Sequence, residues 1–241
     1  MTEQPKLLET VRHITHLRRD RSDDSGWDKT GALSPEMRLL RQWQSHRLAT
    51  TYADLLQSPR YEAAGQFFLK DLYSARDFRQ RDEDIQRVYR VMHGVLPPEI
   101  ARSLERVVEL NDLTWYLDEA LLRALVDDLG VTDTITPEQY AEAYRICQNY
   151  AERMRQIELI VEIGRRLEQL VHRPLVATTL RLARGPAHVV GYGELQEFLE
   201  RGFWAFKQMG GAEEFLLVIG RREREILDRI YAHHPEPFAV W

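Results

Sequence analysis

Helix start and stop residues are the feature that most restricts the folds open to this chain. At three places a hydroxyl residue stands directly before a proline: Ser34, Ser58 and Thr136. A hydroxyl at that position accepts a hydrogen bond from a free N–H at a helix start, and proline suits the first helical position, where no N–H is required. Gly130 stands where a helix would end. These residues predict a chain built from successive helices.

Apolar residues recur at helical spacing between these marks, and no stretch combines strand-type alternation with hairpin turns. Residues 100–129 are expected to form one long helix or two nearly collinear ones. Residues 136–174 are expected to form a single rod of about 55 Å at 1.5 Å per residue. We therefore predict an all-α fold, a single multi-helix bundle of about eight or nine helices with one long central helix.

The chain divides into two expected parts. Residues 1–33 are predicted to form an N-terminal helix and a mobile polar loop, because residues 20–33 hold four aspartates and two glycines around the single tryptophan Trp27. Residues 34–241 are predicted to form the helical bundle domain. Within it, a short helix from Leu175 to Leu182 is expected to stop at Gly185 and Pro186.

Charge and composition exclude some classes of protein. The net charge of -5 and the pI near 5.9 argue against general nucleic-acid binding, which requires a basic face. The single cysteine, Cys147, rules out an intramolecular disulfide and fits a reducing compartment. No apolar run approaches the roughly 20 residues that span a bilayer. We predict a cytoplasmic protein without membrane insertion.

The sequence contains no motif that names a reaction. Acid and histidine pairs occur in three places, and we interpret them as surface ion pairs or helix caps rather than metal ligands. These are Glu9 with His13, Glu168 with His172, and the group His233, His234 and Glu236. The glycine-rich pieces lack the phosphate-loop pattern and a preceding strand. No catalytic residue, metal site or cofactor is predicted, and a non-enzymatic protein is favoured over an enzyme.

A charged connector in residues 66–92 is the expected position for a site of specificity. It sets aromatic residues beside charges of both signs, which can pair with one another or hold an anionic ligand. The structural interpretation is favoured over the functional one. We expect Asp71, Asp77 and Arg81 to form one hydrogen-bonded cluster. The candidate ligand or partner-binding residues are Asp71, Tyr73, Asp77, Phe78, Arg81, Asp82 and Arg87.

The run FFLKDLYSARDFRQRDED, with RLATTYADLL upstream and VELNDLTWYLDEAL downstream, resembles a family of uncharacterised bacterial all-helical proteins. That family has an FFL-x-DLY stretch followed by an RD-x-D element. The resemblance extends from about the second helix to the last and is densest between Phe68 and Asp82. It implies a bacterial, all-helical protein and supplies no activity and no catalytic residue.

Two functions follow as hypotheses. The favoured one is a non-enzymatic interaction or regulatory protein that binds a protein partner or its own copies, because many helices without a catalytic constellation suit a scaffold. The alternative is a helical pocket protein, either a globin-like sensor or a small-molecule enzyme. Haem in such a pocket would need an axial ligand, and His93 is the candidate. The aromatic residues expected to enclose the ligand are Phe67, Phe68, Tyr73, Phe78 and Trp115.

Overall fold

The computed structural model describes residues 26, 33–72, 84–87 and 98–240, and all regular structure in these residues is helical. The all-α prediction is confirmed. The helices are α2 (Pro35–Thr51), α3 (Ala53–Gln57), α4 (Glu62–Phe67), α6 (Pro98–Arg123), α7 (Pro137–Cys147), α8 (Tyr150–Val171), α9 (Val176–Val189), α10 (Gly193–Met209) and α11 (Glu213–Tyr231). Two π-helical segments continue α4 and α6: η1 (Phe68–Leu72) and η2 (Ala124–Asp128).

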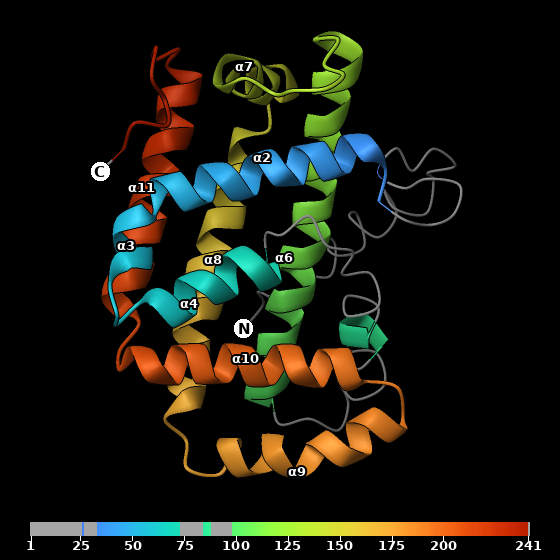
Figure 1. Cartoon of the computed structure of the whole chain (residues 1–241), viewed down its shortest axis with the longest axis vertical. Coiled ribbons are helices and arrows are strands. Elements are labelled where there is room, and N and C mark those ends of the chain that lie inside the picture. Colours follow the sequence, from blue (N-terminus) through green and yellow to red (C-terminus); the bar gives the residue numbers. More distant parts are fainter. Residues whose placement is uncertain (1–25, 27–32, 73–83, 88–97, 241) are drawn as a thin grey trace, which may run out of the picture.

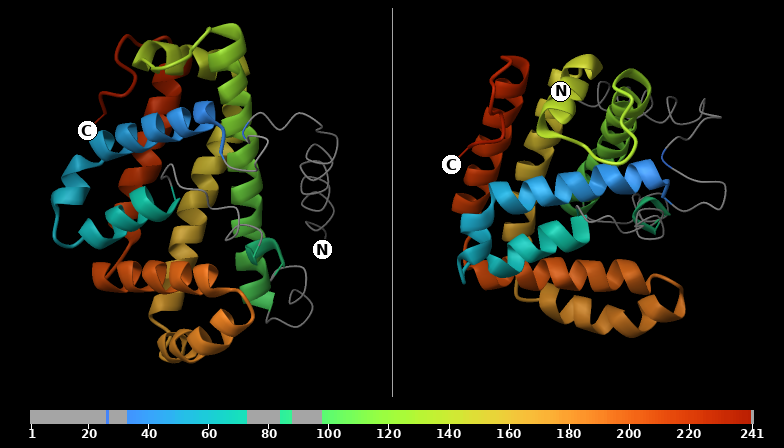
Figure 2. Two further views of the ribbon diagram at one scale, coloured as in Figure 1. Left: turned by 45° about the vertical axis from the view of Figure 1, so that its right-hand side comes forward. Right: turned by 45° about the horizontal axis from the view of Figure 1, so that its top comes forward.

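The helices form two crossing layers (Figure 1). Helices α6, α8 and α11 run along the long axis with α8 in the middle, and α8 packs against both of the others. Helices α2, α4 and α10 cross in front of them (Figure 2). Helix α7 covers one end and α9 the other. The predicted bundle with a long central helix is therefore confirmed, and α8 is that helix.

Two of the three predicted helix starts, Ser34 and Thr136, are present as side-chain hydrogen bonds. The start predicted at Ser58 is wrong, because Ser58 follows the end of α3 and α4 begins at Glu62 without a side-chain cap. The Ser34 hydroxyl accepts from the Met37 N–H at 3.1 Å. At the start of α7, Thr136 accepts from the Gln139 N–H at 3.2 Å, and the Gln139 side chain accepts from the Thr136 N–H at 3.0 Å. These bonds satisfy N–H groups that a helix cannot satisfy internally. Gly130, with φ of 64°, ends the α6–η2 run in the left-handed conformation that glycine adopts without cost.

The single rod expected over residues 136–174 is wrong. Helix α7 ends at Cys147 and α8 begins at Tyr150, because Gln148 takes a left-handed conformation with φ of 50°. The apolar spacing continues through the break, so periodicity alone could not locate it. The bend carries α7 across the end of the bundle, where Tyr140 and Ala143 are buried among residues of α2 and α6.

The stop expected at Gly185 and Pro186 is also wrong. Helix α9 runs through both residues to Val189. Proline inside a helix removes one N–H and crowds the preceding turn, which usually breaks the helix. Here α9 has no buried residue, so water can reach the carbonyl group that loses its partner.

Two glycines allow α8 and α11 to approach closely. A Cβ atom on Gly164 of α8 would lie 2.4 Å from Leu216 Cδ2 of α11, and one on Gly220 of α11 would lie 3.1 Å from Val161 Cγ2 of α8. Leu216 is fully buried. A side chain at Gly164 would therefore push the two helices apart.

The predicted N-terminal part falls mostly outside the described residues, in 1–25 and 27–32. Gly26 is buried beside Met37 and Trp115, and its carbonyl accepts from the Ser34 N–H at 2.9 Å. Leu33 is buried in the hydrophobic cluster that contains Met37 and against which Trp115 packs. Among the described helices, none has the length and apolar character that crossing a bilayer requires.

Candidate functional site

A cavity of about 80 Å³ lies between the two helix layers. Helices α2, α3 and α4 with η1 supply one side, and α6, α7, α8 and α11 supply the other. Part of its wall is polar, although it lies in the interior. The polar wall includes Gln44, Arg47, Asp118, Arg153, Gln156 and Glu223.

A chain of hydrogen bonds orders one part of this wall. Gln44 Nε2 donates to Asp118 Oδ1 at 3.0 Å and lies 3.5 Å from the Tyr140 hydroxyl, which lies 3.3 Å from the Tyr144 hydroxyl. The Tyr140 ring stacks on Trp43 with ring centroids 3.8 Å apart. Burial raises the pKa of Tyr140 well above its ordinary value, so the phenol stays neutral.

Arg153 is the unusual residue of the cavity. Its side chain is 4% exposed, and it forms no ion pair with any described carboxylate. Nη2 donates to the Leu117 carbonyl at 3.0 Å, Nη1 lies 3.4 Å from Gln156 Oε1, and the guanidinium group lies 4.4 Å from the centre of the Tyr144 ring. Nε is buried without a hydrogen-bond partner. A guanidinium group stays protonated in proteins, so Arg153 is a buried cation that no carboxylate of the described residues contacts.

Arg47 is held differently. It forms a short ion pair with Glu223 Oε1, which also accepts from the Tyr52 hydroxyl at 2.7 Å. Burial lowers the pKa of Arg47, but the attraction of Glu223 outweighs this and the net shift is upward. The side chains of Arg47 and Glu223 are 12% and 16% exposed. The pair thus neutralises itself inside the wall.

The rest of the wall is apolar. Leu55, Phe68 and Phe215 line the cavity and belong to one hydrophobic cluster, while Ile157 and Ile160 contribute from α8. In the described part of the chain, no group of three histidine, cysteine or acidic side chains is placed to hold a metal ion. The arrangement supplies hydrogen-bond donors, acceptors and apolar surface, which are the elements of a binding pocket.

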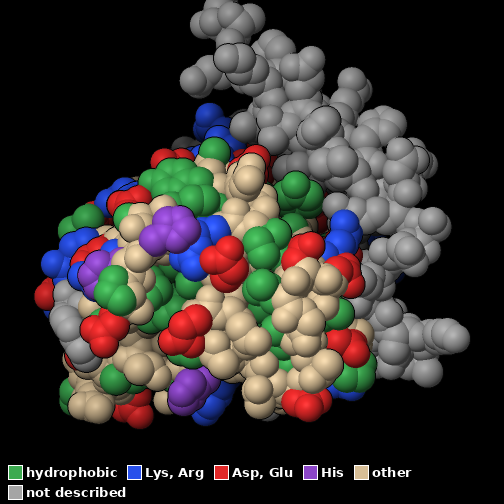
Figure 3. All heavy atoms as spheres, turned by 90° about the horizontal axis from the view of Figure 1, so that it is seen from above, with side chains coloured by type: hydrophobic (Ala, Val, Ile, Leu, Met, Phe, Trp, Pro, Cys, Tyr) green, Lys and Arg blue, Asp and Glu red, His purple; other side chains and the backbone are tan. Residues whose placement is uncertain are grey.

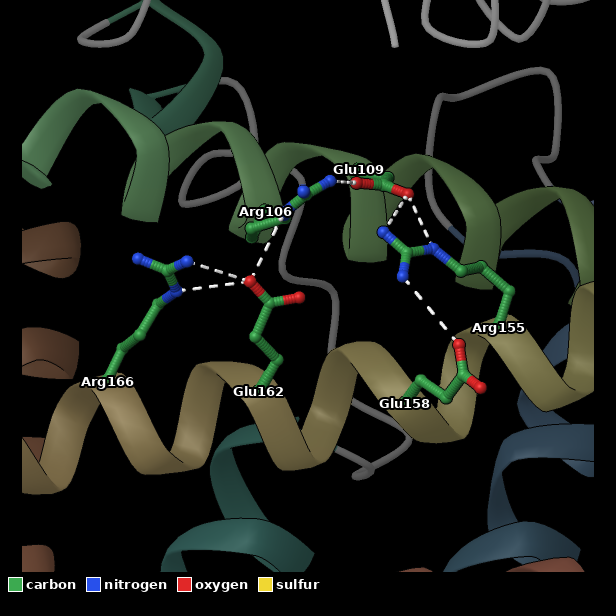
Figure 4. A network of polar contacts seen from close by, with 6 residues as sticks. All are labelled: Arg106, Glu109, Arg155, Glu158, Glu162 and Arg166. Atoms are coloured by element: carbon green, nitrogen blue, oxygen red, sulfur yellow. Dashed lines mark hydrogen bonds and ion pairs between the residues drawn. The ribbon is translucent and has the colours of Figure 1, made fainter. Parts of the chain in front are cut away.

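A second polar cluster joins α6 to α8 on the outer side of the bundle (Figure 4). It contains three cations and three anions, and each arginine contacts a glutamate. Glu109 accepts from Arg106 at 2.7 Å and from Arg155 at 2.8 Å, and Glu162 accepts from Arg166 at 2.9 Å. These charges satisfy one another, so the cluster braces two helices.

The predicted charged connector is described at only two of its seven candidate residues. Asp71 is buried and accepts from Arg201 of α10 at 2.9 Å and 2.8 Å. Arg87 is exposed and lies 3.7 Å from Asp84. Asp71 and Arg87 form no ion pair with each other. The other five candidates lie outside the described residues: Tyr73, Asp77, Phe78, Arg81 and Asp82. The expected cluster of Asp71 with Asp77 and Arg81 therefore lies outside them too.

Of the three described aromatic residues expected to enclose a ligand, only Phe68 lines the cavity. Phe67 instead packs on Phe198 with ring centroids 5.3 Å apart. Trp115 packs against a different hydrophobic cluster, the one that contains Met37 and Leu40, and it lies beside Gly26 and Arg41. Tyr73, Phe78 and the candidate haem ligand His93 lie outside the described residues. One of the expected histidine and acid pairs has another role, because Glu168 accepts from the Ala212 N–H at 2.8 Å near the start of α11.

The cavity residues were missed at the sequence level, although a pattern for them exists. Arg153 and Gln156 stand at helical spacing before Ile157 and Ile160, so two polar residues lie in phase with an apolar stripe. Gln44 is likewise in phase with the buried Leu40 and Leu48. A polar residue in phase with a buried stripe indicates either a buried hydrogen bond or a site.

The surface gives less information about function than the cavity does. Seen from the α7 end, acidic, basic and hydrophobic side chains are interspersed, and no area of one charge dominates this face (Figure 3). Such a face is unlike the basic surfaces that bind phosphate backbones. The expectation of no general nucleic-acid binding stays a prediction.

A family model described as a domain of unknown function, DUF8198, matches residues 27–237. The match spans α2 to α11 and therefore every helix that lines the cavity. No curated protein and no solved structure matches the chain.

Proposed function

The chain belongs to the family defined by this domain of unknown function, and we propose that it is a helical pocket protein that binds a small polar molecule in the cavity between its two helix layers. The observation that carries this proposal is Arg153, a cation that is 4% exposed and lines a cavity without a contacting anion. Sequence reasoning placed such a protein second, behind an interaction protein.

The energetic argument is that a buried charge without a partner costs several kcal/mol. Ionic side chains of this kind are usually paired, as Arg47 is with Glu223. A bound molecule that accepts a hydrogen bond from Arg153 Nε would remove part of this cost. The cavity has room for more than one water molecule, since a single water requires only about 10–15 Å³ of such space.

Native mass spectrometry of the purified full-length protein tests the proposal. We expect a bound small molecule, either carried through purification or taken up from the small-molecule fraction of a cell extract. The cavity-filling variant Ile157→Phe should lose it, because Ile157 lines the cavity. Ile146→Phe is the matched control, since Ile146 is 37% exposed on α7. The pocket proposal is wrong if no molecule is bound either after purification or after exposure to the extract. It is also wrong if both variants retain the bound molecule equally.

The interaction function is a second candidate, supported by the outer face of α9. Leu175, Leu182 and Val189 are 75%, 72% and 87% exposed. Their seven-residue spacing places them on one side of the helix. Residues 172–193 contain three arginines, two histidines and no acid, in a chain of net charge -5. This charge pattern fits an acidic amphipathic helix of a partner protein, whereas it would repel a second copy of α9.

A pair of synthetic helical peptides tests this surface. Both carry leucine at every seventh position, and one has glutamate and the other lysine beside the leucines. We expect only the acidic peptide to bind. The Leu182→Ser substitution should weaken its binding about 10-fold, because an apolar contact is lost. Leu217→Ser is the control, since Leu217 is 55% exposed on α11. Equal binding of the two peptides would contradict the proposal.

The remaining expectations belong to the same proposal. They are a bacterial origin, a place in the cytoplasm, and a role for the FFL-x-DLY and RD-x-D elements. Their support is the resemblance of the sequence itself, together with the membership of a family without an assigned activity.

A further inference from the structure

The charges that line the cavity point to the class of molecule it binds. Two basic and two acidic side chains contribute to its wall: Arg47, Arg153, Asp118 and Glu223. Arg47 and Glu223 neutralise each other by contact. Arg153 and Asp118 line the same cavity but form no ion pair, so their nitrogen and oxygen atoms are more than 4.0 Å apart.

The neighbourhood of these two groups leaves capacity for a ligand. Arg153 Nε has no partner, and its Nη1 makes only a long contact of 3.4 Å. Asp118 Oδ1 accepts one hydrogen bond, from Gln44, and a carboxylate accepts several. Burial lowers the pKa of Arg153, but the surrounding Tyr144, Tyr140 and Asp118 raise it overall. The cavity is therefore lined by a guanidinium group and a carboxyl group that do not contact each other.

We propose that the cavity binds a small zwitterion of the amino-acid type, with its carboxylate on Arg153 and its ammonium group on Asp118. The inference rests on the proposed pocket function. The two basic and two acidic side chains balance in formal charge, so a simple anion or a simple cation would leave an uncompensated charge inside the protein, which is costly. A zwitterion satisfies both groups and keeps the cavity neutral. The apolar remainder of the wall, with Ile157 and Ile160, suits an aliphatic side chain.

The first test uses the wild-type full-length protein and needs no variant. Glycine, L-alanine, L-valine and L-leucine are titrated by calorimetry after extensive dialysis. Isovalerate and isobutylamine serve as analogues of L-valine that lack the ammonium group or the carboxylate. We expect at least one of the four amino acids to bind, and each single-charge analogue to bind about 10-fold or more weakly than L-valine, because it leaves one buried charge unpaired.

The second test changes the charge balance. Asp118→Asn removes the anion and leaves a net cationic cavity, so the variant should bind isovalerate at least as tightly as L-valine. Asp127→Asn is the matched control, because Asp127 is exposed on the neighbouring η2 and does not line the cavity. The reversal of preference is a result that a purely structural role of Asp118 would not produce.

The two proposals fail in different ways. If isovalerate binds wild-type protein as tightly as L-valine, or if the molecule found by mass spectrometry carries a single charge, the zwitterion is wrong and the pocket stands. If none of the four amino acids binds while another small molecule does, the same conclusion holds. If no small molecule binds in either experiment, both proposals are wrong.

Discussion

Arg153 and Arg155 stand two residues apart on α8 and meet opposite environments. Arg155 faces outward, is 35% exposed and contacts Glu109 and Glu158. Arg153 faces the cavity, is 4% exposed and contacts no described carboxylate. The same residue type is thus paired where water could have solvated it and unpaired where it could not. This reversal of the usual rule is the observation that supports the proposed binding role of the inner arginine.

The largest contrast is expected from replacing each arginine in turn. Arg153→Met removes a cation whose burial without a contacting carboxylate is costly, and it should raise the free energy of unfolding by about 1 kcal/mol or more. Arg155→Met should cost about 1 kcal/mol or less, because Glu109 keeps its contact with Arg106. Urea unfolding of both variants measures the difference. Equal losses would remove the distinction between the two arginines.

Tyrosines inside and outside the bundle sharpen the same comparison. Tyr140 is 1% exposed and its hydroxyl joins the chain from Gln44 to Tyr144, whereas Tyr150 is 37% exposed and donates to Asp228 at 2.6 Å. We expect Tyr140→Phe to cost about 1–1.5 kcal/mol and Tyr150→Phe about 0.5 kcal/mol or less, since water replaces only the second bond. Thermal unfolding compares them. A larger loss for Tyr150→Phe would show that the inner chain contributes little.

Salt should separate inner from outer ion pairs. Glu162 and Arg166 have side chains 32% and 34% exposed, and their coupling in a double-mutant cycle should be about 0.3–0.5 kcal/mol at low salt. In 1 M salt the screening length falls to about 3 Å, and this coupling should nearly vanish. The pair of Arg47 and Glu223 should keep most of its coupling, because it lies mostly out of solvent. Parallel losses in both pairs would contradict this.

The smallest effect concerns pH. Asp54 accepts two hydrogen bonds of 2.8 Å from Arg222, which hold the pKa of its carboxyl below the ordinary value. The stabilisation is therefore complete above the unfolded-state pKa of about 3.9 and is lost as the pH falls through the lower folded-state value. Asp54→Asn should flatten the acid limb of the stability curve slightly, since Asp54 is 57% exposed.

Urea titrations over a series of acidic pH values give this slope. Asp133→Asn, an exposed loop residue before α7, is the control. A steeper acid limb in Asp54→Asn would give the opposite sign and would contradict the role of Arg222.

The fold was predictable from the sequence because its information is local. Ser34 and the Thr136–Gln139 pair act on their own helix starts, and periodicity reports which residues are buried. The errors occurred where periodicity carries no signal. Gln148 ends α7 in a left-handed conformation although the apolar spacing continues, and α9 continues through Pro186 at an exposed turn.

The candidate site was less predictable, for the same reason. The Gln44 side chain meets Asp118 from 74 residues away in the sequence, and Arg47 meets Glu223 from 176 residues away. Neither contact can be predicted from the spacing of residues along the sequence. Sequence reasoning looked instead for charges crowded in one segment, and found Asp71, whose partner Arg201 lies 130 residues away.

The glycine contacts of α8 and α11 also determine how a molecule could leave the interior. Gly164 and Gly220 hold these helices so close that parting them would strip Leu216 and Val161 of their packing. The back wall of the cavity is therefore its rigid side. The front is formed largely by α2 and α4, which cross the long helices. If the cavity binds a small molecule as proposed, we expect exchange through this front layer, on the microsecond to millisecond timescale of helix displacements.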